Sequence, residues 1–298
     1  MKKEILLITI FIFLLFLVLY FSPFQHKQFN FLENNKDSNF ALNNSEELNL
    51  FYPNMRFPLS NISYKIYNCE KDKIQEINQS FQIIQNLSVL KFYPIKNNEQ
   101  ISIFCEEKKE DFNQLYVAGE GGPTEITVSG NFKIIKKGEI HLIKKSDCDK
   151  PNIVIHELFH VLGFNHSINK EDIMYNVTNC NQKINPLAIS YLNDLYSIPS
   201  LSDLEISNVS VVINGRFLDL NSTVKNTGII SSNNSTLFIY EDGKIIETFN
   251  LGDLCEGCSK IISIGNVWIN SYKTDNLSLE IKTNEKELNE ENNKIKLN

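Results

Sequence analysis

The pattern of hydrophobic and polar positions changes several times along the 298-residue chain, and a folded body begins at about residue 58. Residues 62–67 (ISYKIY) alternate as a β-strand does. Residues 72–92 then place apolar side chains three and four positions apart, as an amphipathic helix does. Three strand-like runs follow, with a predicted turn, EGGP, between the first and the second. The runs are 101–107, 124–135 and 139–145, and the turn is 120–123.

Two further helices are predicted by their end signals as well as by their periodicity. The segment PNIVIHELFHVLG begins with Pro151, which suits the first turn of a helix, and ends at Gly163, which suits a left-handed stop. In the segment NPLAISYLNDLYSIP, Asn185 is a suitable N-cap and Pro186 a suitable first residue. Pro199 closes this unit. The first part of the body is therefore expected to combine helices with a sheet.

From residue 202 onward the pattern consists only of short alternating segments separated by turn residues. The sequence EDGK at 241–244, between two strands within the run 235–249, is a strong hairpin signal. Five or more strands in fewer than 100 residues are typical of a β-sandwich. The strand-like segments are 203–213, 216–228, 235–249, 259–269 and 276–284. The sequence therefore predicts an all-β, Ig-like sandwich domain at residues 202–298.

The N-terminus carries an apolar run, Ile5 to Phe21, that is long enough for a single membrane-spanning helix at residues 1–22. Lys2 and Lys3 precede the run, so the positive-inside rule places the rest of the chain outside the cytoplasm. The alternative is a cleaved signal peptide and a secreted protein. Residues 23–57 are polar and Asn-rich, which predicts a flexible stalk or, alternatively, a short pro-segment.

Charge and cysteine content narrow the class of protein. The 29 basic and 36 acidic residues give a net charge of −7 without a basic stripe, which argues against a nucleic-acid partner. Six cysteines favour an oxidising, extracytoplasmic compartment, although sequence alone does not fix their pairing and leaves free buried thiols as an alternative. Their positions suggest the pairs Cys69–Cys105, Cys148–Cys180 and Cys255–Cys258.

The motif HELFHVLGFNH, residues 156–166, predicts a metal site. His156 and His160 are four residues apart, so on a helix both imidazoles can reach one ion. Gly163 lets the chain turn sharply so that His166 can return as a third ligand. Three neutral ligands leave one position open for water, whose pKa Zn²⁺ lowers. Glu157 is then the candidate general base.

This motif matches HExxHxxGxxH, the zinc signature of the metzincin metallopeptidases. The tetrapeptide DIMY places Met174 eight residues after His166 and resembles the Met-turn of that clan. Ser167 and a last helix that ends in Leu195–Tyr196 resemble the matrixin branch, over residues 58–199. The resemblance implies an α+β catalytic domain with a mixed twisted sheet, an active-site helix and a C-terminal helix. It also implies one catalytic Zn²⁺; structural Ca²⁺ is not indicated by the sequence.

Several positions depart from relatives within the clan. Tyr175 directly follows Met174, so no tyrosine ligand is transferred, and Ser167 stands where archaemetzincins have a cysteine. Residues 23–57 contain no cysteine, so a cysteine-switch form of latency is not expected. Phe159 replaces a residue that is often small. His141, on a predicted strand, is expected to be structural, with a ligand role as the alternative.

The resemblance also implies how substrates and partners bind. An edge strand within 124–136, preceded by flexible Gly121 and Gly122, is expected to pair with an extended peptide. The loop from Met174 to Pro186 is expected to border the specificity pocket, braced by a Cys148–Cys180 bridge. The second domain, through DLEISNV, LNSTVKNTG, IYEDGK and NEENNKIKLN, resembles cell-adhesion-related (CARDB-like) modules, which implies a binding or spacing role towards a surface ligand.

Together these features predict a membrane-anchored zinc endopeptidase that acts on extracellular or cell-surface proteins and peptides. One alternative is a surface binding or adhesion protein that holds zinc without cleaving, although a purely structural site would not require Glu157. Another is a zinc hydrolase for a non-peptide substrate. Cys255 and Cys258 are read as a local disulfide, with a redox or zinc pair as the alternative.

Overall fold

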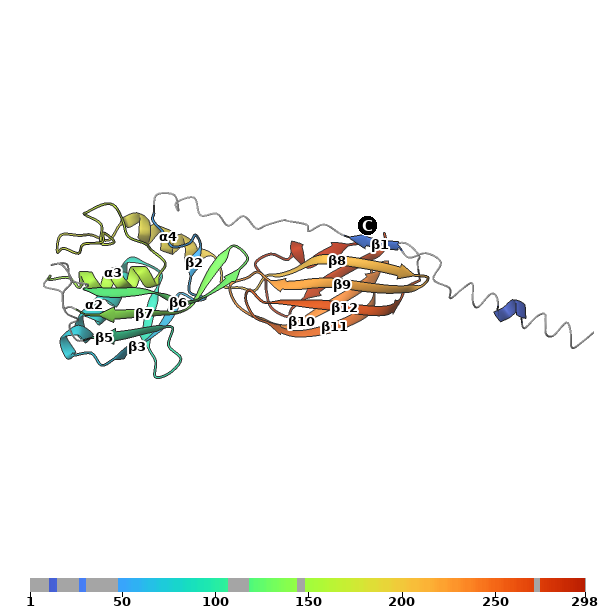
Figure 1. Cartoon of the computed structure of the whole chain (residues 1–298), viewed down its shortest axis with the longest axis horizontal. Coiled ribbons are helices and arrows are strands. Elements are labelled where there is room, and N and C mark those ends of the chain that lie inside the picture. The colour runs from blue at the N-terminus through green and yellow to red at the C-terminus, as the bar shows by residue number, and fades with distance from the viewer. Residues whose placement is uncertain are drawn as a thin grey trace, which may run out of the picture. The chain divides into compact units, whose positions relative to one another are not determined.

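The structure is a computed structural model (Figure 1). It describes residues 11–14, 27–30, 48–106, 118–143, 148–270 and 274–297. Within these ranges no helix has the length and apolarity needed to cross a membrane. Most of the anchor predicted at 1–22 and most of the stalk predicted at 23–57 lie outside the described residues. The chain divides into two compact units.

The first unit, made largely of residues 39–201, combines one sheet with three helices among the described residues. The helices are α2 (Lys71–Leu87), α3 (Asn152–Val161) and α4 (Pro186–Ser197). The strands are β2 (Met55–Arg56), β3 (Asn61–Tyr67), β4 (Lys91–Pro94), β5 (Ile101–Cys105), β6 (Gly119–Ser129) and β7 (Phe132–Leu142). The predicted mixed α+β domain is confirmed.

The sheet is parallel except at one edge. Its order is β2-β7-β5-β3-β4, and β6 runs antiparallel to β7 along the free side of that strand. Figure 1 shows α2 and α3 close to the sheet. The apolar face of α2 buries Ile77, Phe81 and Ile84 in the core. Because α3 packs against β6 and β7, the metal-site helix lies next to the edge strand.

Two predictions for this unit are wrong in detail. The helix predicted over 72–92 ends at Leu87, because the Ser88 hydroxyl bonds the Ile84 carbonyl (2.8 Å) and the following residues pair as β4. The turn predicted at 120–123 lies inside β6, and the run 124–135 is broken instead by a hairpin at Gly130, where φ is +53°. The glycines of β6 are placed there by close packing against α3, as described below.

The second unit is an all-β sandwich, as predicted. Its sheets have the orders β1-β8-β9-β12 and β11-β10-β13-β14. Its helical element is η1 (Glu291–Asn293). The strands are β1 (Lys27–Asn30), β8 (Leu204–Asn214), β9 (Phe217–Asn226), β10 (Ser232–Glu241), β11 (Lys244–Leu254), β12 (Ser259–Trp268), β13 (Leu277–Lys282) and β14 (Lys294–Lys296). Alternate residues of β8, β9, β10, β12 and β13 point inward and form one apolar core.

The sequence signals in the sandwich correspond to specific turns and pairings. Asp242 and Gly243 both have positive φ, 48° and 74°, so the predicted EDGK hairpin between β10 and β11 is confirmed. β1, which falls within the predicted stalk, pairs antiparallel with the edge of β8. The sandwich therefore takes one strand from a part of the chain that precedes the first unit.

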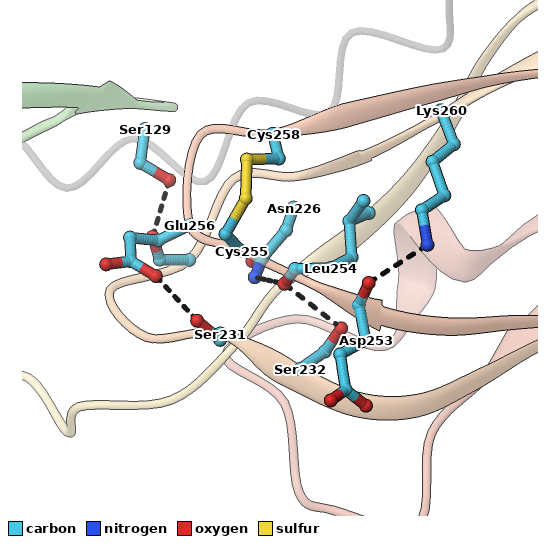
Figure 2. The surroundings of a disulfide bond; sticks show 11 residues. Ser129, Asn226, Ser231, Ser232, Asp253, Leu254, Cys255, Glu256, Cys258 and Lys260 are labelled. Carbon is cyan, nitrogen blue, oxygen red and sulfur yellow. Dashed lines mark hydrogen bonds between the residues drawn. A yellow bond between two sulfur atoms is a disulfide. The ribbon is translucent and has the colours of Figure 1, made fainter.

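The structure pairs the cysteines as their positions suggested: Cys69–Cys105, Cys148–Cys180 and Cys255–Cys258. Figure 2 shows the last of these closing the turn between β11 and β12. Beside it, the Asn226 amide donates to the Leu254 carbonyl (2.9 Å), and the Ser231 hydroxyl donates to the Glu256 carboxylate (2.8 Å). The pair is therefore bonded as the local disulfide that was expected, and in this form its sulfurs are not thiolates that could bind zinc.

Candidate metal centre

The end of α3 is a regular helix stop that redirects the chain. Gly163 has φ +101°, and its amide bonds the carbonyl of His160 (3.0 Å). The amide of Phe164 bonds the carbonyl of Phe159 (3.0 Å). These two bonds form a Schellman motif, in which a left-handed residue ends the helix. The chain leaves α3 at this point, and His166 follows three residues later.

The three motif histidines come together at one point. The Nε2 atoms of His156 and His160 are 3.0 Å apart, and those of His160 and His166 are 3.2 Å apart. A ligand atom from each lies within 4.8 Å of the others, so this group could hold a metal ion. His156 and His160 are buried on α3, whereas His166 is exposed. The helical spacing and the glycine turn thus produce the convergence expected from the sequence.

The histidine tautomers fit a cation. Nδ1 of His156 donates to the Ile173 carbonyl (2.7 Å) and Nδ1 of His160 donates to the Phe164 carbonyl (2.8 Å), because a carbonyl only accepts. Both Nε2 atoms therefore present lone pairs to one another, which is unfavourable unless a cation or a proton lies between them. Burial lowers the pKa of His156 and lowers that of His160 to about 4, so a proton is disfavoured.

The spacing also fits zinc. A tetrahedral Zn²⁺ with bonds of about 2.05 Å to imidazole nitrogen would separate its ligand atoms by roughly 3.3 Å. The separations of 3.0 and 3.2 Å between Nε2 atoms are close to that value. Carbonyl partners on the other ring nitrogen are the usual outer contacts of zinc-bound histidine. The donor set of this site therefore suits Zn²⁺ with one coordination position left for water.

Met174 lies in a tight, buried turn that contacts the histidine cluster through the backbone. Its carbonyl accepts from the amide of Ser167 (2.8 Å), the residue after His166. The neighbouring Ile173 carbonyl is the one that holds His156. The turn therefore connects the first and the third histidine. Met174 itself is 4% exposed, in agreement with the apolar, non-ligand role that its resemblance to a Met-turn implies.

Asp172 organises this turn, a role that the motifs did not indicate. One carboxylate oxygen accepts from the amide of Met174 (2.9 Å), and the other accepts from the Asn185 amide group (3.2 Å). Asn185 in turn caps α4 by accepting from the amide of Leu187 (3.0 Å), as its N-cap prediction required. Asp172 is 6% exposed. An acidic residue two positions before a methionine is the signal that could have identified it.

Glu157 is buried between α3 and the edge strand β6. It is 5% exposed, and burial, with a smaller contribution from the charge of Glu120, raises its pKa to about 8. A divalent cation beside it would favour the carboxylate and lower this pKa. A β-carbon built on Gly119 would come within 3.0 Å of Glu157 Oε1. One built on Gly121 would lie 2.5 Å from the Glu157 carbonyl oxygen.

These contacts correct the expectation that Gly121 is a flexible residue before the strand. Gly119 and Gly121 lie within β6 and let it approach α3. Of the three glycines of β6, Gly122 alone has open space where a β-carbon would be. The sequence signal that was misread is the position of glycines two residues apart, which put them on the same face of a strand.

The remaining predicted residues have structural partners. His141 lies on β7, where Nδ1 contacts Glu106 Oε1 (2.6 Å) and Nε2 contacts Glu139 Oε2 (3.4 Å), in agreement with a structural role. Phe159 is fully buried and packs edge-to-face on Phe164. Tyr175 follows the Met174 turn and is only partly exposed.

The loop between Met174 and Pro186 is fixed by covalent and polar contacts. The Cys148–Cys180 disulfide joins it to the segment before α3. The Asn152 amide donates to the Asn179 carbonyl (2.8 Å), and the Gln182 amide donates to the Val177 carbonyl (2.9 Å). Because Asn152 is the first residue of α3, the loop is attached to the same helix that carries His156 and His160.

Comparison with known protein families agrees with this arrangement. Residues 54–200 match the family model described as matrixin, and residues 201–296 match the family model described as CARDB. None of the curated proteins matches the chain. The boundary between the two matches falls where the mixed α+β unit ends and the sandwich begins. The chain therefore carries a matrixin-like domain, a metalloprotease type, followed by a C-terminal CARDB domain.

Proposed function

We propose that the protein is a zinc-dependent endopeptidase that hydrolyses peptide bonds of proteins or peptides outside the cytoplasm. The observation that carries this proposal is the convergence of three imidazole groups at one point. Two of them come from α3, which also carries the buried Glu157. A structural zinc site is usually closed by four protein ligands, whereas three leave a position for water. The matrixin match supports the same class of enzyme.

Each residue of the site has a distinct role in this proposal. His156, His160 and His166 hold the ion, and the carbonyls of Ile173 and Phe164 orient the first two rings. Bound zinc supplies Lewis acidity, which lowers the pKa of a coordinated water and polarises the scissile carbonyl. Glu157 accepts the proton of the attacking water and delivers it to the leaving amine.

The surroundings of the site favour an extended substrate. β6 is an edge strand that pairs with β7 on one side, and an extended peptide can pair along an edge of this kind. The edge strand starts at Gly119, which lies against Glu157, so a peptide along β6 passes close to the general base. The loop from Met174 to Pro186, braced by the Cys148–Cys180 disulfide, would border the specificity pocket.

We also propose that the body of the protein lies outside the cytoplasm, held by a single-pass anchor at residues 1–22 or secreted after signal cleavage. The support is the charge pattern Lys2–Lys3 before the apolar run and the three disulfides, which persist in oxidising compartments. The CARDB domain at 201–296 would bind a surface ligand or act as a spacer. Protein substrates and surface ligands are therefore the proposed partners.

A broad peptide library separates this function from its two alternatives. The purified protein is loaded with one equivalent of Zn²⁺ and incubated with the library, with and without a chelator, and fragments are identified by mass spectrometry. We expect internal cleavages that stop with the chelator and resume on zinc addition. Stoichiometric zinc without any cleavage would favour the binding-protein alternative. Hydrolysis of small esters or amides alone would favour a non-peptide hydrolase.

A further inference from the structure

A short segment that precedes the matrixin match runs along the loop that carries the third histidine. This segment, residues 48–51 (LNLF), lies outside the matched range of 54–200. Leu50 forms an antiparallel bridge with Phe164. On either side of the bridge, the amide of Asn165 donates to the Asn49 carbonyl (2.8 Å), and the amide of Phe51 donates to the Gly163 carbonyl (2.9 Å). We call residues 48–51 the N-terminal strap.

The strap also contacts the third histidine directly. The Asn49 side-chain amide donates to the backbone carbonyl of His166 (2.7 Å). The amide of His166 donates to the Asn165 side chain (2.7 Å), so both backbone groups of this residue have partners. Phe51 adds a ring contact, because its ring stacks on that of His160 with the centroids 5.8 Å apart. The strap therefore touches two of the three histidines.

The third histidine depends on such backbone contacts more than the other two do. His156 and His160 lie on a helix and each has an Nδ1 atom held by a carbonyl. Among the described residues, His166 has no comparable partner for its Nδ1, and its ring is exposed. Its position follows from the path of residues 163–166, which begin at a glycine with φ +101°. Without the strap, the loop would keep the bond from the Ser167 amide to the Met174 carbonyl, but the Gly163 and His166 carbonyls would lose the partners described above.

We propose that the N-terminal strap pre-organises the metal site, with Asn49 acting as a positioning residue that holds His166 in its ligand position. The inference rests on the proposed zinc function, but it concerns residues that the family match does not include. If a ligand side chain becomes ordered only when the ion binds, the protein binds the ion more weakly. Neighbouring groups that orient the side chain beforehand therefore strengthen metal binding. The strap thus makes a segment of the predicted stalk part of the metal-binding machinery.

Zinc affinity of the full chain tests this directly. Asn49→Leu removes the side-chain donor at nearly constant size, and Asn97→Leu, on the exposed loop between β4 and β5, is the matched control. Both apo proteins are titrated with Zn²⁺ against a chromogenic chelator, and the zinc dissociation rate is measured by transfer to excess chelator. We expect Asn49→Leu to bind about three- to tenfold more weakly, mainly through faster dissociation, because one solvent-exposed hydrogen bond is lost. Asn97→Leu should match the wild type.

A second variant tests the backbone pairing. Phe51→Pro removes the amide that bonds the Gly163 carbonyl, and we expect it to weaken zinc binding by about tenfold or more. Co²⁺ substitution gives a further signature, since a loosened third ligand changes the visible absorption of a tetrahedral site. If both variants bound and released zinc as the wild type does, the proposal that the N-terminal strap pre-organises the metal site would be overturned. A wild-type chain that fails to bind one Zn²⁺ would instead overturn the proposed function itself.

Discussion

Gly163 and Met55 approach so closely that the glycine has no room for a side chain. A β-carbon at position 163 would lie 3.0 Å from Sδ, 3.1 Å from Cγ and 3.2 Å from Cβ of Met55. Met55 belongs to β2 and is 2% exposed, so it has little freedom to move away. The residue that ends the metal-site helix is thus constrained both by its positive φ and by its neighbour.

Substitution of Gly163 should therefore affect folding and metal binding together. Gly163→Ala combines strain at φ +101° with the Met55 contact, and we expect it to cost about 1–3 kcal/mol of unfolding free energy. We also expect weaker zinc binding, because the path to His166 starts at this residue. Denaturant unfolding of the apo protein and a zinc titration measure the two effects. Gly215→Ala, also at positive φ but with open space, separates the strain from the clash.

Replacement of Glu157 should separate chemistry from metal binding. Glu157→Gln keeps the size of the side chain and leaves all three histidines in place, so zinc content should stay at one ion per chain. Peptide cleavage should fall by about 10²- to 10⁴-fold, the usual contribution of a general base. Metal analysis of the purified variant, together with turnover of a peptide found in the library digest, checks both parts. A variant that retains wild-type turnover would remove Glu157 from the mechanism.

The glycines of β6 offer a matched pair of variants. At Gly121 an added methyl group would lie 2.5 Å from the backbone oxygen of Glu157, so β6 or α3 must shift. We expect Gly121→Ala to cost about 1–3 kcal/mol of stability and to reduce cleavage at least tenfold, since small displacements of reacting groups are costly. Gly122→Ala meets nothing within 4 Å and should change stability by less than about 0.5 kcal/mol. Thermal unfolding and peptide turnover compare the two.

A buried carboxylate in the CARDB domain makes the stability of that domain depend on pH. Glu287 is 5% exposed and accepts from the Leu204 amide (2.6 Å) and the Asn293 side chain (2.9 Å). Burial, together with the charges of Asp203 and Glu290, raises its pKa from 4.5 to about 7. Between these two values the folded state binds more protons than the unfolded state, so stability falls as pH rises.

We therefore expect the unfolding free energy of this domain to decrease by up to about 3 kcal/mol between pH 4.5 and pH 7.5. The single tryptophan of the chain, Trp268 on β12, makes its fluorescence a specific probe of this domain. Urea unfolding at a series of pH values gives the dependence. Glu287→Gln should remove most of this pH dependence. If the unfolding free energy of that variant still fell with pH as in the wild type, the effect would belong to Asp203 or another group.

Local signals in the sequence were reliable where the chemistry itself is local. The helix of the HExxH motif, the stop at Gly163, the N-cap at Asn185 and the EDGK hairpin all depend on neighbours within a few residues. The convergence of the histidines could be predicted for the same reason, because a helix and one turn determine it.

The errors arose where distant contacts decide the structure. EGGP has the composition of a turn, yet Gly119 and Gly121 lie in a strand because α3 packs against it. Residues 48–51 lie at the end of a segment, 23–57, that is polar and Asn-rich as a whole, and their role depends on a loop more than 100 residues away, to which Asn49 bonds. One of the two contacts of Asp172, that with Asn185, likewise joins positions 13 residues apart in the chain. Composition and periodicity describe neighbours along the chain, so they do not predict contacts between residues that are far apart in the sequence.

The outer edge of β6 has a further consequence for association between molecules. The pairing of β6 with β7 is irregular on both sides of Glu125, and Pro123 lacks an amide hydrogen. A long, regular edge would invite the same strand of a second copy to pair with it, whereas an interrupted edge discourages such self-assembly. The interruption leaves the edge able to accept a short extended peptide, so the strand that would recognise substrate is also protected against forming fibres.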